Sequence, residues 1–318
     1  MIGLHASHEQ FGPDSLLEYV QLAEQAGFDA AMCSDHFYPW SDAQGQSGFA
    51  WSWLGAAMQA TRLPFGVVCA PGQRYHPAII AQAAATLQVM FPDRLFLAIG
   101  SGQALNEHIT GDRWPSKTER NERLRECAEI IHALWAGETV NHQGQVVVED
   151  AHLYTRPDTP PLLVGAAVTP QTAGFVGGWA DALITVSQPR SVLRQVVEEF
   201  RAAAGAAKPC YLQVHLAYAP TDVEARSAAH DQWRQNVHSS AVLTEIRTVQ
   251  QMESLGGHVR PGDMDTAVRI SSSVEQHIDW LGADLELFDS LYLHETGRNQ
   301  RRFIEVFGER VLPALRER

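Results

Sequence analysis

The chain has 318 residues, 45% of them hydrophobic, and a formal net charge of −13 with only two lysines. This acidic balance argues against binding to nucleic acid or another polyanion, and no apolar run is long enough to span a membrane. No signal segment is found, and the four cysteines are far apart without a Cys-x-x-Cys pair. We therefore expect a cytoplasmic protein with reduced thiols.

Strand and helix patterns alternate along the chain. Short apolar runs predict eight strands, and the amphipathic segments between them predict helices. The predicted strands are 2–6, a run that ends at Ser34, 65–69, 95–99, 162–165, 182–186, 211–217 and 291–294. The main predicted helices are 13–26, 51–60, one that begins at Pro77, 117–135, 191–204 and 300–315. Eight such units close most naturally into an α/β (β/α)8 TIM barrel, with an open doubly wound sheet as the alternative. Because no linker or repeat is found, we predict a single domain, 1–318.

Two segments depart from this alternation. The segment 139–154 has the pattern of a small hairpin that turns at its Gln-Gly pair. The polar segment 222–260 forms an insertion before the last strand, either as a lid over the site or as a peripheral addition. After it, Asp265 is placed to cap a further helix that reaches Leu281.

An acid and an imidazole directly follow the second predicted strand. Asp35 and His36 come after Ser34, where the strand ends and a loop begins. In parallel α/β folds, ligands bind at the carboxyl ends of the strands. We therefore interpret His36 as an acid–base residue, with Trp40 as an aromatic wall for a planar ring. The plainer interpretation, that His36 only caps local backbone, fits the spacing equally well.

A glycine-rich turn, Gly100-Ser101-Gly102, follows the fourth predicted strand. It is not a dinucleotide fingerprint, because Leu105 stands where the third glycine belongs. The polar residues Gln103, Asn106 and Glu107 lie just behind this turn. We predict that the loop contacts a ligand, since glycine allows close backbone approach.

Other catalytic signatures are absent from the sequence. His5 and His8 lack the spacing of metal ligands, so no metal site is predicted, whereas Glu9 is a candidate pocket carboxylate at the end of the first strand. Neither a Gly-x-Ser-x-Gly elbow nor a phosphate-binding Gly-x-x-x-x-Gly-Lys loop is found. A serine hydrolase and a P-loop nucleotide-binding protein are therefore not expected.

Four segments together resemble a known family. They are Ser34-Asp35-His36-Phe37-x-Pro39-Trp40, Arg74-Tyr75-His76-Pro77-Ala78, Gly100-Ser101-Gly102-Gln103-Ala104-Leu105-Asn106-Glu107 and Asn299-Gln300-Arg301-Arg302-Phe303. On these segments the chain resembles the luciferase-like superfamily, nearest its F420-dependent glucose-6-phosphate dehydrogenase branch. The resemblance implies a (β/α)8 barrel that binds an isoalloxazine-type ring at its C-terminal face, a small-molecule substrate, and assembly as a homodimer.

Carried over by position, the resemblance implies three groups of site residues. The catalytic group is His36, Glu9 and Gln103. The cofactor-binding group is Asp35, Val68, Cys69, Ala70, Gly102, Gln103, Asn106, Gly165, Ala166, Val186 and Ser187. The substrate-binding group is Trp40, Glu107, Arg190 and Arg269. Within the second group, the family pattern gives 68–70 a bulge that supports the back of the ring, although this stretch is one residue shorter here.

Two further departures from the family pattern bear on chemistry. Gln103 stands where the family has a glutamate, and an amide can hydrogen-bond the ring but cannot deliver a proton. The lysines that hold a sugar phosphate are also missing, since Pro189 and Arg190 occupy the region of the first, and Arg269 is the nearest base to the others. We therefore do not expect glucose 6-phosphate as the substrate. The chain also resembles a lineage of this branch that uses FMN instead of F420, and its acidic, lysine-poor composition favours the short tail of FMN.

Three functions remain open on the sequence. The first is a flavin-dependent oxidoreductase, a monooxygenase if the coenzyme is FMN and a dehydrogenase or reductase if it is F420. The second is a non-catalytic protein that binds or stores the flavin, favoured by the missing acid at Gln103. The third is a metal-free barrel hydrolase with Glu9 and Glu107 as paired carboxylates.

Overall fold

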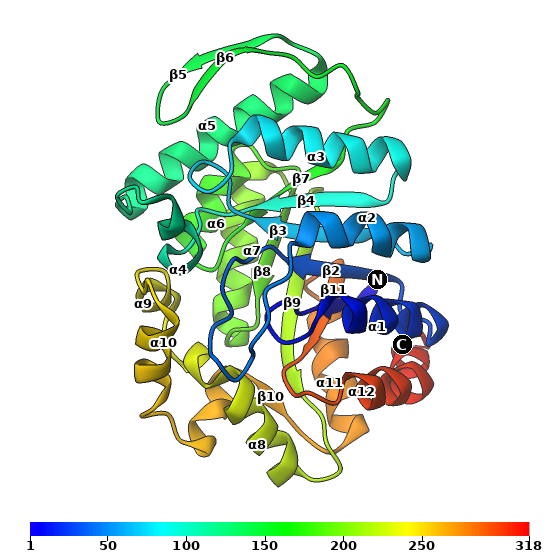
Figure 1. Cartoon of the computed structure of the whole chain (residues 1–318). Helices are drawn as coiled ribbons and strands as arrows, with labels where there is room; N and C mark the ends of the chain where they lie inside the picture. Colours follow the sequence, from blue (N-terminus) through cyan, green and yellow to red (C-terminus); the bar gives the residue numbers. More distant parts are fainter. Residues whose placement is uncertain (318) are drawn as a thin grey trace.

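In the computed structural model, which describes residues 1–317, parallel strands close into a barrel (Figure 1). The barrel strands are β1 (Ile2–Ala6), β2 (Ala30–Ser34), β3 (Phe65–Cys69), β4 (Leu95–Ile99), β7 (Leu162–Ala166), β8 (Ala182–Val186), β9 (Cys210–Ala217) and β11 (Ser290–Glu295). Within residues 1–317 these eight pair in that order, and β11 pairs back with β1. The predicted (β/α)8 barrel is confirmed, and the open doubly wound sheet is excluded. Each strand lies within one residue of its predicted range.

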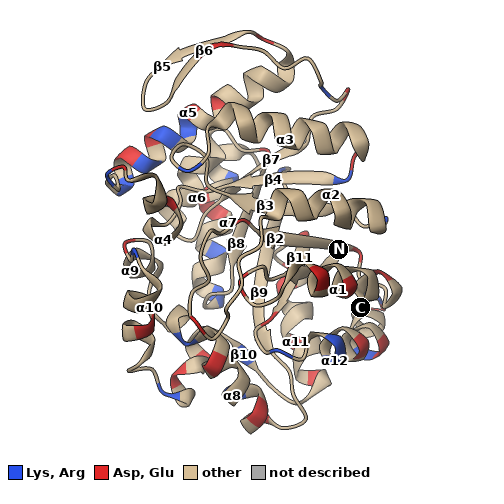
Figure 2. Cartoon of the chain, viewed as in Figure 1, with Lys and Arg blue, Asp and Glu red and all other residues tan. Residues whose placement is uncertain are grey.

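The barrel strands are almost free of charge. Among the eight described above, only β11 carries a charged side chain, Glu295. Figure 2 shows that most charged residues lie on the surrounding helices and loops. Strands of a parallel barrel are buried on both faces, by the lumen and by the helices. Their near-continuous apolar runs are therefore what made them recognisable in the sequence.

Helices follow the strands and cover the outside of the barrel (Figure 1). They are α1 (Pro13–Gln25), α2 (Ala50–Ala60), α3 (Pro77–Met90), α4 (Ala104–Glu107), η1 (His108–Thr110), α5 (Lys117–Ala136), α6 (Pro170–Gly177), α7 (Arg190–Ala204), α11 (Val274–Leu285), α12 (Gln300–Val306), the π-helical turn η4 (Phe307–Val311) and α13 (Leu312–Arg316). Helix α5 begins with a capping box, in which Ser116 and Glu119 satisfy each other's backbone N–H groups. Among the described residues, none of the helices combines the length and the hydropathy that a membrane crossing requires.

The predicted hairpin is confirmed outside the barrel. Strands β5 (Val140–Gln143) and β6 (Val147–Ala151) pair antiparallel beside α5 (Figure 1). The imidazole of His142 and the backbone N–H of Val146 both contact the carboxylate of Glu126 on α5, at 2.9 and 3.2 Å. These contacts hold the hairpin against the helix that precedes it.

Aromatic rings fill the lower part of the barrel lumen. Phe96, Tyr211 and Tyr292 lie within 5.5–6.3 Å of one another between ring centroids. Gly66 faces this cluster, and a Cβ atom there would lie 1.9 Å from the Phe96 ring. The lumen is therefore a packed core at this depth rather than a pore, which leaves the carboxyl ends of the strands as the place for a ligand.

The insertion before the last strand consists of short elements. They are α8 (Asp222–Trp233), η2 (Arg234–Val237), α9 (Ser240–Leu243), α10 (Val249–Gly256), η3 (Pro261–Thr266) and β10 (Arg269–Ile270). The prediction of a helix from Asp265 to Leu281 is wrong in its first half. Asp265 lies in η3, and 269–270 pair with the end of β9. The helix begins only at Val274, where the hydroxyl of Ser273 caps it.

The insertion packs on the loops at the carboxyl ends of the strands. Its own apolar core contains Trp233, Leu243 and Met252, and Trp40 and Leu105 from the barrel loops are buried in the same cluster. The side-chain amide of Gln44 further donates to the carbonyl of Gln232 at 2.9 Å. Because the insertion shares a core with these loops, it covers part of the ligand-binding end. This sharing supports the predicted single domain, which stays a prediction.

Candidate active site

Glu9 and His36 meet at the ends of β1 and β2. Nδ1 of His36 lies 2.5 Å from Oε1 of Glu9, and the hydroxyl of Ser7 donates to Oε2 at 2.8 Å. Burial alone would raise the pKa of Glu9, but the His36 imidazole lowers it to about 2. The carboxylate is therefore ionised at neutral pH. The structure thus brings together two residues that the sequence placed in one catalytic group.

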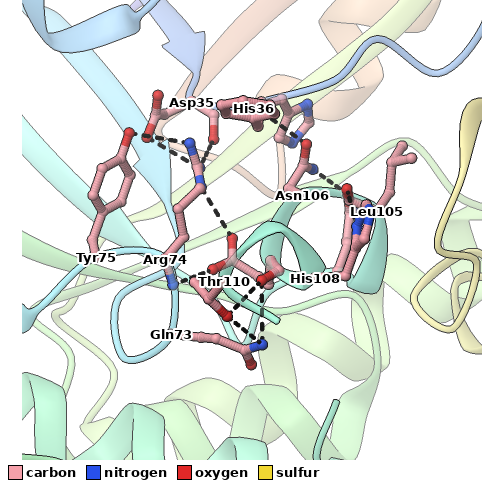
Figure 3. A network of polar contacts seen from close by, with 12 residues as sticks. Asp35, His36, Gln73, Arg74, Tyr75, Leu105, Asn106, His108 and Thr110 are labelled. Atoms are coloured by element: carbon pink, nitrogen blue, oxygen red, sulfur yellow. Dashed lines mark hydrogen bonds and ion pairs between the residues drawn. The ribbon is translucent and has the colours of Figure 1, made fainter. Parts of the chain in front are cut away.

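Arg74 joins Asp35 to Glu107, and Figure 3 shows Arg74 beside Asp35. Nη2 of Arg74 donates to the carbonyl oxygen of Asp35 at 2.7 Å and to its Oδ2 at 3.3 Å. Nε donates to Oε1 of Glu107 at 3.4 Å, and the Arg74 backbone N–H donates to Oε2 at 2.8 Å. All three side chains are buried. We call these three residues the Asp35–Arg74–Glu107 triad.

The triad was not foreseen from the sequence. Arg74 appeared there only within a family segment and was assigned no role, because its two partners lie on other loops. Burial raises the pKa of Glu107 even though Arg74 pulls it down. The structure ties Glu107 to Arg74, so its predicted contact with substrate stays a prediction. Glu9 is engaged with His36 and Glu107 with Arg74, which removes the basis for a paired-carboxylate hydrolase.

Asn106 links two of the loops at this end (Figure 3). Its Oδ1 accepts the backbone N–H groups of Phe37 and Tyr38 at 2.9 and 3.1 Å, and its Nδ2 donates to Oε1 of Gln103 at 3.2 Å. The side chain of Asn106 is buried. It therefore holds the loop after β2 in place, and a direct contact of Asn106 or Gln103 with a cofactor stays a prediction.

Small side chains line one side of the barrel mouth, at the ends of β3, β4 and β7. We call Val68, Ala70, Gly100, Gly102 and Ala166 the small-residue seat. A Cβ atom at Gly100 would find only Ala166, at 3.5 Å, and Gly102 has a φ of +80°. The absent side chain at Gly100 and the short one at Ala166 would let a planar ring approach the backbone there.

A buried carboxylate oxygen at this end has no partner. Oδ1 of Asp35 forms no hydrogen bond with any residue in 1–317. A buried acceptor of this kind fits an N–H group of a flavin-type ring. The seat and this oxygen together fit the ring that the resemblance implied.

The end of β3 departs from the family expectation. Its register with β4 runs without a shift from Phe65 to Cys69, so no bulge lies within that paired stretch. The Cys69 side chain belongs to the core between strands and helices, whereas Val68 packs toward the lumen. The four cysteines are buried and unpaired. This stretch is one residue shorter than in the family pattern, and a strand without a bulge needs one residue fewer. The continuous register therefore agrees with the shorter sequence.

The remaining predicted cofactor residues lie at the ends of β7 and β8. Gly165 packs so closely on α6 that a Cβ atom would lie 2.6 Å from Val176. Ser187 follows Val186 directly, and its hydroxyl accepts the backbone N–H of His215 at 3.0 Å. Their positions at the ligand-binding end agree with the expectation, and their roles stay predictions.

Trp40 closes one side of the site. It is buried, its ring lies edge-on to His36 with centroids 5.6 Å apart, and it lies 6.5 Å from Trp233 of the insertion. The two predicted substrate arginines are engaged elsewhere. Arg190 donates to the carbonyl of Ala283 and pairs with Glu286. Arg269 forms a two-pronged ion pair with Asp284.

Three histidines form a polar layer in the lumen that the sequence did not reveal. The His294 ring lies 4.6 Å from His5 and 5.5 Å from His215, and Nε2 of His294 lies 2.9 Å from Oε1 of Gln10. Burial lowers the pKa of His5 to about 4 and that of His215 to about 3. They are neutral at pH 7 and add no charge beside the site. The signal available in the sequence was that His5, His215 and His294 each occupy an inward-facing position, since inward and outward positions alternate along β1, β9 and β11.

A cavity of about 440 Å³ opens beside His36. Its walls are mainly Phe37, Phe49, Tyr75 and Ile109. We call this the His36 cavity. Polar atoms reach it from His36 itself, Ser47 and Arg74.

A lysine lies near the glycine-rich turn. Nζ of Lys117 donates to the hydroxyl of Ser101 at 2.8 Å. The side chain remains accessible, but partial desolvation lowers its pKa to about 8. One of the two lysines of the chain is thus held at the mouth of the barrel.

The chain is similar to known proteins over nearly its whole length. The family model described as "Luciferase-like monooxygenase" matches residues 2–287. An F420-dependent glucose-6-phosphate dehydrogenase of Microbacterium testaceum is 34% identical, with 99% of this chain and 97% of that protein covered. One of Beutenbergia cavernae is 35% identical, with 100% and 98% covered.

Solved structures are similar over the same length. An F420-dependent secondary alcohol dehydrogenase, solved with an F420–acetone adduct, has a TM-score of 0.91 and 28% identity over 99% of this chain and 98% of its own. A monooxygenase from Streptomyces bottropensis has a TM-score of 0.75 at 19% identity, with 98% of each chain covered, which shows a shared fold.

Proposed function

We propose that this chain, which belongs to the luciferase-like monooxygenase family and is an oxidoreductase, uses coenzyme F420 to oxidise or reduce a small organic molecule. The observation that carries the proposal is the Glu9–His36 pair. It places an imidazole, held by a buried carboxylate, at the end of the barrel where the small-residue seat leaves room for a ring. A store for the coenzyme has no use for such an acid–base group.

The storage alternative is not supported. Relatives that match almost the whole chain are named as dehydrogenases, and the acid–base pair is retained here. Gln103 alone had favoured storage, through the loss of one acid. An oxidoreductase that protonates through His36 accounts for both observations.

The coenzyme is better assigned as F420 than as the FMN that the sequence favoured. The relatives named above and the similar alcohol dehydrogenase are F420-dependent by name. Oδ1 of Asp35 would accept an N–H group of the ring, and the small-residue seat would lie against its face. Lys117 near Ser101 would offer a cation to an acidic tail. Bound F420 would supply a two-electron hydride acceptor or donor.

The chain's own residues would supply binding and proton transfer. Nε2 of His36 is free to take a proton from a hydroxyl group or return it to a carbonyl, because Nδ1 is occupied by Glu9. The ionised Glu9 stabilises the imidazolium that forms. Gln103 can only hydrogen-bond, so we assign the proton transfer to His36.

Assembly and location complete the proposal. Ile79 and Met90 on α3 are more than half exposed, and a homodimer that buries them would explain their apolar character. The four unpaired cysteines fit a reducing compartment, the cytoplasm. Sedimentation of the purified chain as a monomer would contradict the dimer.

The first test is a titration with F420 and with FMN, followed by fluorescence quenching. Tight binding of F420 and weak binding of FMN is the expected result. The reverse order would restore FMN and direct the search to oxygen-dependent reactions. Binding of neither would overturn the proposed function.

A further inference from the structure

We infer that Arg120 is a positioning residue that couples the insertion to the small-residue seat, because it joins the insertion to the glycine-rich turn. This inference rests on the proposed function and adds how the seat is held in place. It is carried by two contacts of the Arg120 guanidinium, with Glu245 of the insertion and with the ring of Trp114.

Arg120 is buried and contacts three groups from different segments. It lies on the first turn of α5, and its side chain is 2% exposed. Nη2 donates to Oε1 of Glu245, just beyond α9, at 2.9 Å, and Nη1 donates to the carbonyl of Pro115 at 2.7 Å. The guanidinium also lies over the Trp114 ring, 4.4 Å from its centroid. Because the guanidinium is planar and rigid, these contacts fix the three groups relative to one another.

Trp114 extends this contact to the coenzyme seat. A Cβ atom at Gly102 would lie 3.4 Å from Cη2 of Trp114, so the indole ring packs against the glycine-rich turn. Gly102 has a φ of +80°, a conformation that favours glycine, and it belongs to the small-residue seat. A displacement of Trp114 would therefore move the backbone on which the ring of the coenzyme would lie.

A second contact joins the insertion to the same loop. The backbone N–H of Ala104 donates to the carbonyl of Thr244 at 2.9 Å, and Figure 1 shows α9 beside α4. Leu105 is buried in the apolar cluster of the insertion. The insertion therefore holds the start of α4 directly, while Arg120 holds the turn before it through Trp114.

Coupling between two sites is reciprocal. If the docked insertion favours binding of the coenzyme, the bound coenzyme must stabilise the docked insertion by the same free energy. Bound F420 should therefore slow hydrogen exchange in 240–247, through the loop 100–107 that lies between. A role of Arg120 confined to the stability of α5 predicts no such protection.

The first test is a fluorescence titration of the full chain with F420. Arg120→Gln should raise the Kd roughly 10-fold, because the turn loses its tie to the insertion. Arg120→Lys keeps a charge beside Glu245 but loses the planar fork, and it should recover part of the affinity. The matched control is Arg226→Gln, which breaks an ion pair with Asp265 inside the insertion and should leave the Kd unchanged.

Glu245→Gln makes the test independent of any folding defect in Arg120→Gln. The Glu245 side chain is 53% exposed, so its loss should spare the fold. The Kd for F420 should still rise, although less than in Arg120→Gln, since the Pro115 and Trp114 contacts remain.

Hydrogen exchange with and without F420 gives the second readout. In the wild type, F420 should slow exchange in 100–107 and in 240–247. In Glu245→Gln at saturating F420, the protection of 240–247 should be reduced while that of 100–107 remains.

Three outcomes would overturn the inference while F420 dependence stands. They are a Kd that stays at the wild-type value in both Arg120→Gln and Glu245→Gln, an equal rise in Arg226→Gln, and exchange in 240–247 that F420 leaves unchanged in the wild type. Failure of the wild type to bind F420 would instead overturn the proposed function, and the inference with it.

Discussion

The imidazole of His36 and the carboxylate of Glu9 come from the ends of neighbouring strands and lie 2.5 Å apart, with the carboxylate buried and the imidazole partly open to the His36 cavity. One nitrogen of the ring, Nδ1, is thus held by Glu9, and the ring as a whole lines the cavity.

His36→Ala should lower turnover by roughly 10²–10⁴-fold, because a positioned acid–base group contributes about that much. F420 affinity should change little, since Asp35 and the small-residue seat are untouched. Stopped-flow reduction of F420 and a fluorescence titration measure the two effects. Glu9→Gln should cause a smaller loss and a shifted pH profile. An unchanged turnover in His36→Ala would remove His36 from the mechanism.

Arg74→Gln should destabilise the fold by about 3–5 kcal/mol, because it leaves the carboxylates of Asp35 and Glu107 buried without their cation. The pKa of Glu107 would rise further, so the loss should be smallest at low pH, where Glu107 is protonated, and should grow as the pH rises. Urea unfolding at several pH values measures this.

Two variants control for the Arg74 prediction. Arg74→Gln with Glu107→Gln removes one of the two stranded carboxylates and should recover part of the stability. Arg113→Gln breaks an exposed ion pair and should have little measurable effect. If Arg113→Gln and Arg74→Gln lowered the free energy of unfolding equally, the Asp35–Arg74–Glu107 triad would stabilise the fold no more than an exposed ion pair does.

The stability of the fold should fall as the pH drops from 6.5 toward 4. In the folded chain the pKa of His5 is about 4 and that of His215 about 3, against an ordinary value of 6.5. The unfolded chain therefore binds protons in this window that the folded chain excludes, and each histidine contributes on the order of 3 kcal/mol. His215→Gln should flatten the profile, and the exposed His258→Gln should not. A flat wild-type profile down to pH 4 would refute the prediction.

Gln103→Glu should increase the rate of F420 reduction by an alcohol, toward the roughly 10²-fold that a general acid can add. A carboxyl group can exchange a proton where the amide cannot. The hydrogen bond from Nδ2 of Asn106 survives, because the new carboxylate still accepts it. Single-turnover rates across pH measure the gain. Gln103→Met is similar in length but has no group that can exchange a proton, so it should show no gain in rate.

Trp40→Ala should loosen the insertion from the barrel. The ring is buried in the same cluster as Trp233 and Met252, and its loss should cost about 3–5 kcal/mol. Hydrogen exchange within 222–260 should accelerate more than exchange in the barrel strands. Trp135→Ala removes an equally buried ring from α5 and should destabilise the chain without this local effect.

The barrel was predictable because burial on both faces makes each parallel strand a short apolar run. The insertion has no such apolar runs, so its elements could not be located in the same way. Its helices are short, and their apolar positions, such as Leu243 and Met252, match a cluster completed by Trp40 and Leu105 from other loops. The apolar positions of these helices therefore do not follow the helical period, because residues far away in the sequence supply the rest of the core. Strand β10 was missed because two residues are too few to show a period.

The acid–base pair was predictable from position, since Glu9 and His36 both follow predicted strands. The partners of Arg74 and the lumen histidines were not, because each contact joins residues on different strands or loops. Chain order says which strands are neighbours, but not which side chains of their loops reach one another. Those contacts depend on loop paths that the glycine-rich turns leave open.

Lys117 is suited to selective chemical modification. Its amine, with a pKa of about 8 beside Ser101, would be roughly a quarter unprotonated at pH 7.5, against about a thousandth for an ordinary lysine. The second lysine, Lys208, already donates to the carbonyl of Ala180. An activated ester at limiting dose should therefore acylate Lys117 ahead of Lys208, which peptide mapping would establish, and a fluorophore attached there would report directly on events at the mouth of the barrel.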